Sequence, residues 1–174
     1  MILLIPISLV ACSTQPTEPV QTTSNAAIVP TDTPTTPALT PTQTTPNDST
    51  EEAEIRELVE TFGKTLQTVS LQAPDAAQEI EKRYSEFVSG SLLDMWMSDV
   101  SKAPGRIVSS PWPDRIEITT LAKEGSDRYV MDGFVVEVTS VEAVNGGAAA
   151  KIPVRVVVGK DQGRWVITEY AEER

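Results

Sequence analysis

A long tract without basic residues limits how much of this chain can fold. Residues 13–50 contain 13 Thr, 7 Pro and 3 Ser among 38 positions, and no Lys or Arg. A segment of this composition buries too little apolar surface to offset its conformational entropy, and its prolines favour an extended chain. We therefore expect a spacer whose reach lies between roughly 35 Å as a flexible coil and roughly 120 Å when extended. Residues 51–174 are expected to form one domain.

The N-terminal segment is uncharged and mostly apolar as far as Cys12. It is shorter than the about 20 residues that a membrane-spanning helix needs, and its length is typical of the apolar region of a signal peptide. The sequence Leu9-Val10-Ala11-Cys12 resembles the lipobox of bacterial lipoproteins. That resemblance implies cleavage between Ala11 and Cys12, loss of residues 1–11, and lipid on the Cys12 thiol. Val10 occupies a position where Ala or Ser is commoner, and no positive charge precedes the apolar run, so we expect the true start to lie upstream.

Cys12 is the only cysteine, so the chain cannot form an internal disulfide. Two or more acyl chains on this residue give stable attachment to a membrane, whereas a single chain gives only marginal binding. The resemblance thus implies an extracytoplasmic protein held at the cell membrane by its lipid, and the spacer favours a Gram-positive cell surface. Residues 12–50 would then be the lipidated cysteine and its spacer.

The charge of the expected domain excludes one class of partner. All 14 basic residues lie in residues 51–174 together with 22 of the 25 acidic ones, which gives a net charge of about −8. A nucleic-acid-binding domain carries a basic surface instead. An acidic surface is also repelled by anionic lipid headgroups, which fits a domain held away from the membrane by a spacer.

Apolar residues at helical spacing come first in this domain. They predict a helix over about 50–70 that begins with Ser49 as its cap and Glu52 completing a capping box. A second helix is expected over about 75–88, and a short third one capped by Ser91. The inward-facing positions are Ile55, Leu58, Val59, Phe62, Leu66, Val69, Ala77, Ile80, Tyr84, Phe87 and Val88, with Leu92, Leu93, Met95, Trp96 and Val100 partly buried.

Four segments with a period of two follow an irregular link rich in proline. They predict strands over 115–123, 127–141, 149–160 and 164–169. Gly133 in the second strand indicates a bulge or bend, and Pro153 places part of the third strand at an edge or a bulge. Helices followed by an antiparallel meander are typical of the α+β class.

This order of elements resembles the NTF2-like superfamily over about residues 50–172. The resemblance rests on the helix with Leu92-Leu93 and Trp96, the long bent second strand and the closing Gly163-Arg164-Trp165-Val166-Ile167 hairpin. Residues 103–118 also resemble uncharacterised Gram-positive lipoproteins of this architecture. The resemblance implies a cone of three N-terminal helices packed on a bent antiparallel sheet of four or more strands.

The sequence contains no histidine, and this excludes several kinds of metal site and catalytic site. Zinc sites of the His or Cys type are excluded, as are Ser-His-Asp and Cys-His nucleophile systems. The sequence also lacks the phosphate-loop, dinucleotide, zinc-protease and calcium-loop patterns. We therefore expect no metal and no cofactor.

Enzymes of the superfamily hold acid and base groups inside the cone, and the resemblance implies Tyr84, Tyr129, Asp132 and Glu117 as candidates. A buried Asp132 would have a raised pKa and act as a base, with Tyr129 beside it. Asp132 as a solvated strand residue, and Tyr84 as a core residue, are the alternatives.

The most distinctive stretch for binding surrounds Trp112, which lies between two prolines. The prolines restrict the backbone there, and Arg106 and Arg115 lie close in the sequence. Trp and Arg are favoured where proteins bind peptides, glycans or anionic groups. The alternative is that Trp112 closes one end of the cone. Tyr84, on a helix face beside Phe87, completes this candidate binding set.

Three hypotheses follow from these patterns. The leading one is a tethered, non-catalytic binding or accessory module that holds a small apolar molecule, a cell-wall fragment or an envelope protein. The second is a lipid-anchored enzyme of the isomerase or dehydratase type that uses Asp132 and a tyrosine. The third is an assembly subunit that forms a homodimer through the outer sheet face around residues 154–158.

Overall fold

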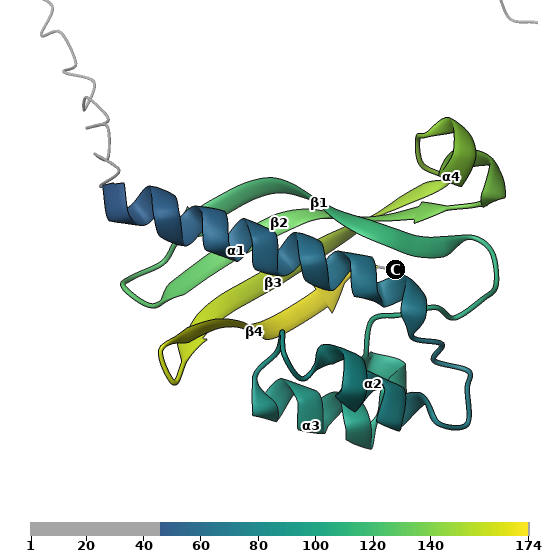
Figure 1. The fold of residues 1–174 in the computed structure, drawn as a ribbon, viewed down its shortest axis with the longest axis horizontal. Coiled ribbons are helices and arrows are strands. Elements are labelled where there is room, and N and C mark those ends of the chain that lie inside the picture. Colours follow the sequence, from purple (N-terminus) through teal and green to yellow (C-terminus); the bar gives the residue numbers. More distant parts are fainter. Residues whose placement is uncertain (1–45, 174) are drawn as a thin grey trace, which may run out of the picture. The chain divides into compact units, whose positions relative to one another are not determined.

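In residues 46–173, the part of the chain that the computed structural model describes, all helices except a short one between the second and third strands precede the sheet (Figure 1). Ala11, Cys12 and the expected spacer up to residue 45 lie outside this part. The sheet has the order β1-β2-β3-β4, with all neighbours antiparallel. The elements are α1 Pro46–Thr65, a 3₁₀ turn Leu66–Thr68, α2 Ala76–Tyr84, α3 Gly90–Ser98, a 3₁₀ turn Val100–Lys102, β1 Trp112–Lys123, β2 Arg128–Val138, α4 Ser140–Asn145, β3 Ala150–Asp161 and β4 Arg164–Glu172.

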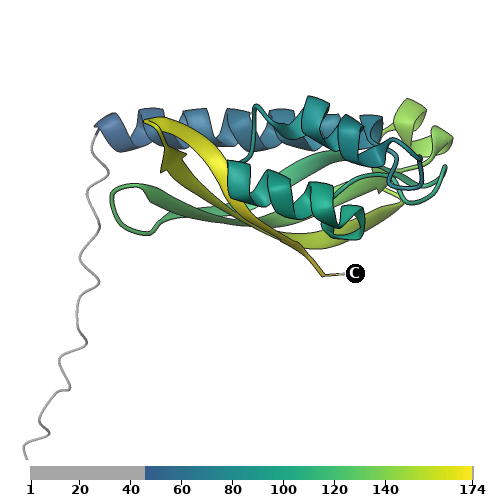
Figure 2. The same cartoon turned by 90° about the horizontal axis from the view of Figure 1, so that it is seen from below.

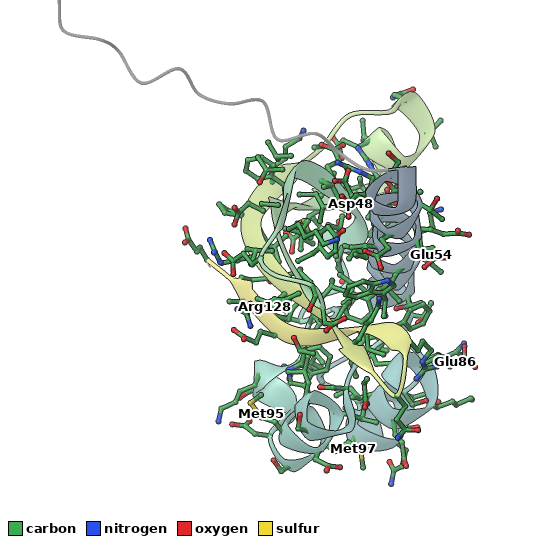
Figure 3. All side chains as sticks on the ribbon, turned by 90° about the vertical axis from the view of Figure 1, so that its left-hand side faces the viewer. Asp48, Glu54, Glu86, Met95, Met97 and Arg128 are labelled. Atoms are coloured by element: carbon green, nitrogen blue, oxygen red, sulfur yellow. The ribbon has the colours of Figure 1, made fainter. Side chains whose placement is uncertain are left out.

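The predicted α+β class is confirmed, with helices packed on a bent antiparallel sheet of four strands. Helix α1 lies along one face of the sheet (Figure 2). Viewed along α1, the sheet curves around the side chains that fill the space between it and the helix (Figure 3). The predicted helical stripe faces this space, because Ile55, Val59, Phe62, Leu66 and Val69 are all fully buried.

Helix α1 begins earlier and ends earlier than the sequence predicts. It starts at Pro46, a residue suited to the first helical turn, so Ser49 lies inside the helix and the prediction of Ser49 as its cap is wrong. The helix thus begins five residues before the expected domain boundary at residue 51. The helical path ends because the backbone of Val69 is extended. The Val69 carbonyl accepts the backbone N–H of Arg106 at 2.8 Å.

Helix α2 also stops short of its predicted end, because residues 87–89 run beside the free edge of β4. Ile167 donates its backbone N–H to the Phe87 carbonyl at 2.8 Å and accepts the N–H of Ser89 at 2.9 Å. Ser89 then caps α3, since its hydroxyl accepts the Leu92 N–H at 3.4 Å. The predicted cap at Ser91 is therefore replaced by one two residues earlier.

Bulges bend the sheet at the places that Gly133 and Pro153 mark. The pairing of β1 with β2 skips Asp114 and Thr119, and the second skip lies opposite Gly133. Pro153 is in an interior strand, and its carbonyl accepts the Glu173 N–H at 3.0 Å, but residues 150–152 before it pair with β2 alone, so this end of β3 is an edge on one side. Both predictions are confirmed.

The short helix α4 was not expected. Its residues fall in the predicted end of the second strand and the turn after it. Thr139 ends β2 because its hydroxyl accepts the Val141 N–H, while Glu142 accepts the Thr139 backbone N–H. This reciprocal pair is a capping box, which satisfies the free N–H groups of the first turn.

A cluster of aromatic rings joins the helices to the sheet around Phe62. Its ring centroid lies 5.1 Å from that of Tyr84, 6.3 Å from Trp96, 5.9 Å from Phe87 and 5.9 Å from Tyr170. Aromatic pairs at these separations add about 0.5–1.5 kcal/mol each beyond the burial of their surface. The cluster therefore holds α1, α2, α3 and β4 together.

Gly133 is expected to resist even the smallest side chain. A Cβ atom there would lie 2.3 Å from the Glu117 carbonyl oxygen of β1, which is backbone and has little freedom to retreat. We expect Gly133→Ala to lower the free energy of unfolding by about 1–3 kcal/mol, as overpacking does. Urea denaturation followed by circular dichroism measures this.

Gly90→Ala is the matched control, because a Cβ atom at Gly90 meets nothing within 4 Å. This change should leave the free energy of unfolding unaltered or raise it by about 0.4–1 kcal/mol, since it restricts the unfolded chain. Equal stability of the two variants would contradict the close approach of β1 to β2 at Gly133.

Candidate functional site

A hollow with an exposed apolar rim lies between α3, the segment 101–107 and the end of β4, and we call it the α3–β4 pocket. Its volume is about 430 Å³. Trp96, with 1% of its surface exposed, belongs to both the pocket wall and the core. Met95 and Ile107 also line it, and they are 44% and 47% exposed. The other lining residues are Leu71, Ser101, Lys102, Ala103, Pro104, Gly105, Tyr170, Ala171 and Glu172.

Several polar groups at this pocket form hydrogen bonds or ion pairs with neighbouring residues. The Tyr170 hydroxyl donates to the Glu172 carboxylate at 2.6 Å. The Ser101 hydroxyl donates to Asp99 at 2.6 Å, and Lys102 forms an ion pair with the same carboxylate at 3.5 Å. The pocket therefore offers an aromatic and aliphatic surface with fixed polar groups beside it.

Tyr84 and Arg106, two predicted binding residues, lie behind the pocket wall. Tyr84 is fully buried, and its hydroxyl donates to the Pro104 carbonyl at 2.9 Å. Burial raises the pKa of Tyr84 far above its ordinary value, so the hydroxyl stays protonated. Arg106 is anchored through its backbone, and its buried Nε finds no hydrogen-bond partner among the described residues. Tyr84 is thus a core residue that fixes the segment lining the pocket.

Trp112 and Arg115 lie at the start of β1 and not at this pocket. Trp112 pairs with Val138 of β2 and is partly exposed. The Arg115 guanidinium donates to Asp114 at 2.8 Å and to Glu117 at 2.6 Å. The structure therefore gives the four predicted binding residues different surroundings and does not assemble them into one site.

The predicted acid/base pair is not assembled either. Asp132 is exposed on the outer face of β2, where it pairs with Arg155 at 3.3 Å. Tyr129, three residues away on the same strand, points into the core. Glu117, the other candidate, accepts from Lys151 and Arg115, which lower the pKa of its carboxyl. A single substrate atom cannot contact both Asp132 and Tyr129 in this arrangement.

Tyr129 belongs to an ion-pair cluster at the start of α1. Lys160 donates to the Glu51 carboxylate at 2.9 Å, and Lys123 donates to it at 3.2 Å and also to Asp48. The Tyr129 hydroxyl donates to Glu51 at 3.3 Å. These contacts fasten the first turns of α1 to β1 and to the end of β3.

The described residues offer neither a metal-ion site nor a membrane-spanning helix. Within residues 46–173, no group of three His, Cys, Asp or Glu side chains is placed to hold a metal ion. No helix in the same range is both long enough and apolar enough to cross a bilayer.

Comparisons with known proteins give a fold likeness alone. No family model and no curated protein matches this sequence. Similar solved structures include a variant of a protein named Rd1NTF2_05, at 17% identity and a TM-score of 0.38, covering 71% of this chain and 99% of that one. Another is the intermembrane space region of the chloroplast protein ARC6, at 13% identity and a TM-score of 0.37. The match covers 71% of this chain and 94% of that one. A third is a protein of unknown function with a cystatin-like fold from Nostoc punctiforme, at 16% identity and a TM-score of 0.44. The match covers 76% of this chain and 94% of that one. The fold class therefore rests on the elements and topology of this chain.

The pocket could not be predicted from the sequence because its walls come from four separate segments. Met95 was expected to be partly buried and is instead among the most exposed large apolar residues. The adjacent apolar pair Ile107 and Val108, in a link rich in proline and serine, was the one available signal. Both side chains are about half exposed, at 47% and 54%.

The ion-pair cluster predicts a pH dependence of stability. The hydrogen bonds from Lys160 and Lys123 hold the pKa of Glu51 below its ordinary value of 4.5. A lowered folded-state pKa contributes stability that is complete above the unfolded-state pKa and is lost as the pH falls through the folded-state value. Glu51→Gln should therefore lower the Tm at neutral pH, and the difference from the wild type should close as the pH falls through the lowered pKa of Glu51. Thermal melts in a pH series measure it.

Glu54→Gln serves as the control, since Glu54 is exposed one turn away and forms no ion pair with any residue of 46–173. Its Tm should follow the wild type at every pH. A Glu51→Gln deficit that is constant from neutral to acidic pH would show that the carboxylate charge does not hold α1 in place.

Proposed function

We propose that the α3–β4 pocket binds a small amphipathic molecule, in a non-catalytic domain that lipid on Cys12 tethers outside the cytoplasm. The observation that carries the binding proposal is the exposed apolar rim of Met95 and Ile107 beside buried Trp96. An apolar ligand would remove this rim from water, which is favourable by about 25 cal/mol per Å² of surface buried.

The size and composition of the pocket support this proposal. A volume of about 430 Å³ falls within the range of about 300–1,000 Å³ typical of small-molecule sites. Its aromatic and aliphatic residues suit a hydrocarbon or ring, and Lys102 and Glu172 suit a polar end group. A small apolar molecule of this kind is among the ligands that the sequence favoured.

The positions of the acidic residues favour binding over catalysis. A general base must reach the proton that it removes, at about 2.6–3.2 Å. Asp132 lies on the outer face of the sheet and Tyr129 on the inner one, and neither lines the α3–β4 pocket. The alternative of an isomerase or dehydratase that uses these two residues therefore gains no support from their geometry.

The proposal of a lipid tether is supported by the sequence of the N-terminal segment. The likeness of Leu9-Val10-Ala11-Cys12 to a lipobox supports cleavage and lipidation, and residues 13–45 would separate the lipid from α1. A Gram-positive cell surface, with a cell-wall fragment or an envelope protein within reach, is the setting that we propose.

A bound molecule should be visible by native mass spectrometry of the full chain purified from cells that lipidate it. We expect one stoichiometric non-covalent mass on the wild type. Ile107→Glu should weaken its retention at least about tenfold, because a carboxylate at the rim must be desolvated when the apolar ligand binds.

Val108→Glu is the matched control, since Val108 is the neighbouring exposed residue and does not line the pocket. It should keep the bound mass. Equal loss of the ligand from both variants, or a clean unliganded mass for the wild type, would contradict binding in the α3–β4 pocket.

The tether is tested separately with Cys12→Ser. The wild type should sediment with membranes after a high-salt wash and carry the mass of its acyl chains, since each buried methylene stabilises the anchor by about 0.8 kcal/mol. The variant should lack this mass and leave the membrane fraction. If Cys12→Ser remained in washed membranes, the anchor would have to lie elsewhere.

A further inference from the structure

A second hollow lies on another side of the domain, between α1 and the β3–β4 hairpin, and we call it the α1–β4 groove. Its volume is about 690 Å³. Leu58, Phe87 and Trp165 give it an apolar surface. Leu58 and Phe87 are partly exposed, although both also pack against the core. None of these three residues lines the α3–β4 pocket.

Four carboxylates and two cations, Lys160 and Arg164, border this apolar surface, so its charge is acidic on balance. Glu54 and Glu57 come from α1, and Glu86 follows α2. Figure 3 shows Glu54 and Glu86 on the same side of the domain. All three are exposed, and none forms an ion pair with any residue of 46–173. Glu51 differs, because Lys160 and Lys123 already neutralise it at one end of the groove.

Part of the β4 backbone has no partner among residues 46–173 where it meets the groove. Arg164 and Val166 turn their backbone groups towards β3, so those of Trp165 and Ile167 face the free edge of the sheet. Residues 87–89 cover this edge at Ile167. At Trp165 no backbone group of residues 46–173 pairs across it. An open strand edge is a place where an extended chain can add to a sheet.

From these features we propose that the α1–β4 groove docks an extended segment of another protein, in which Lys or Arg side chains lie two positions to either side of an apolar side chain and so share its face. The apolar side chain packs on Leu58 and Phe87, and the cations pair with the three free carboxylates. The segment's backbone exchanges hydrogen bonds with Trp165. This docking is independent of the ligand in the α3–β4 pocket.

Charge argues against this chain's own N-terminal part as the occupant. All 14 basic residues follow position 50, so residues 13–45 offer no cation to Glu54, Glu57 or Glu86. The groove and the N-terminal part are therefore not complementary, whereas a basic and apolar segment from a partner protein is.

The test uses the full chain with Cys12→Ser, which keeps it out of detergent, and a fluorescein-labelled peptide amide of sequence Gly-Lys-Ser-Val-Ser-Lys-Ser-Lys-Gly, whose valine and lysines share one face when it is extended. Fluorescence anisotropy should show saturable binding. The triple variant Glu54→Gln, Glu57→Gln, Glu86→Gln should weaken binding about tenfold, because three exposed ion pairs are lost. Methylating the backbone nitrogen of the valine or of either neighbouring serine in turn should weaken it in at least one of the three peptides.

The matched control removes the same charge elsewhere on the surface with Glu81→Gln, Asp94→Asn and Glu173→Gln, none of which lines the groove. It should change the Kd by less than about twofold, because distant exposed charges are screened at an ionic strength of about 0.15 M. An equal loss of peptide affinity in both triple variants would show that the effect comes from the net charge of the protein, and this would overturn the proposal. So would the absence of saturable binding, tight binding of the peptide with Glu in place of Lys, or full affinity of all the methylated peptides.

Discussion

The packing of Phe62 at the centre of the aromatic cluster holds this domain together. Its ring meets rings from α2, α3, the segment after α2 and β4, so one side chain of α1 links the helices to the far edge of the sheet. The next residue, Gly63, brings α1 close to β1, where a Cβ atom would lie 2.6 Å from the Ile116 nitrogen. The position of α1, and of every surface that it borders, depends on these two neighbouring residues.

Two hollows of different chemistry result from this packing. Trp96 and Tyr170 of the cluster also line the α3–β4 pocket, and Phe87 of the same cluster lines the α1–β4 groove. The pocket combines an exposed aliphatic rim with polar groups that already have partners, which suits a small amphipathic ligand. The groove combines an apolar surface with carboxylates and a strand edge that have no partner among the described residues 46–173, which suits a basic polypeptide segment. Because both hollows share the cluster, the rigid core fixes the geometry of each.

Much of the fold could be predicted because local patterns and long-range packing agree. The stripe from Ile55 to Val69, the four strands and the bend at Gly133 all follow from periodicity and turn chemistry. The ends of α1 and α2 could not be predicted, since Val69 and Val88 leave helical paths to lie beside Arg106 and Ile167, far away in sequence. Helix α4 has six residues and little periodicity, although Thr139 and Glu142 stand at capping-box spacing. The separation of Asp132 from Tyr129 was predictable, because residues three apart on a strand face opposite sides.

The sequence by itself determined the α+β class, the acidic charge, the lack of histidine chemistry and the single cysteine at the lipobox-like site, since these depend on composition and local spacing. Tertiary structure alone decided that Tyr84 is a core residue, that Arg115 is held by Asp114 and Glu117, and that Met95 and Ile107 meet at one rim. It also decided which carboxylates have cations beside them and which do not. The physical reason is that hollows and ion pairs form between segments far apart in the chain, where the packing around Phe62 sets the distances.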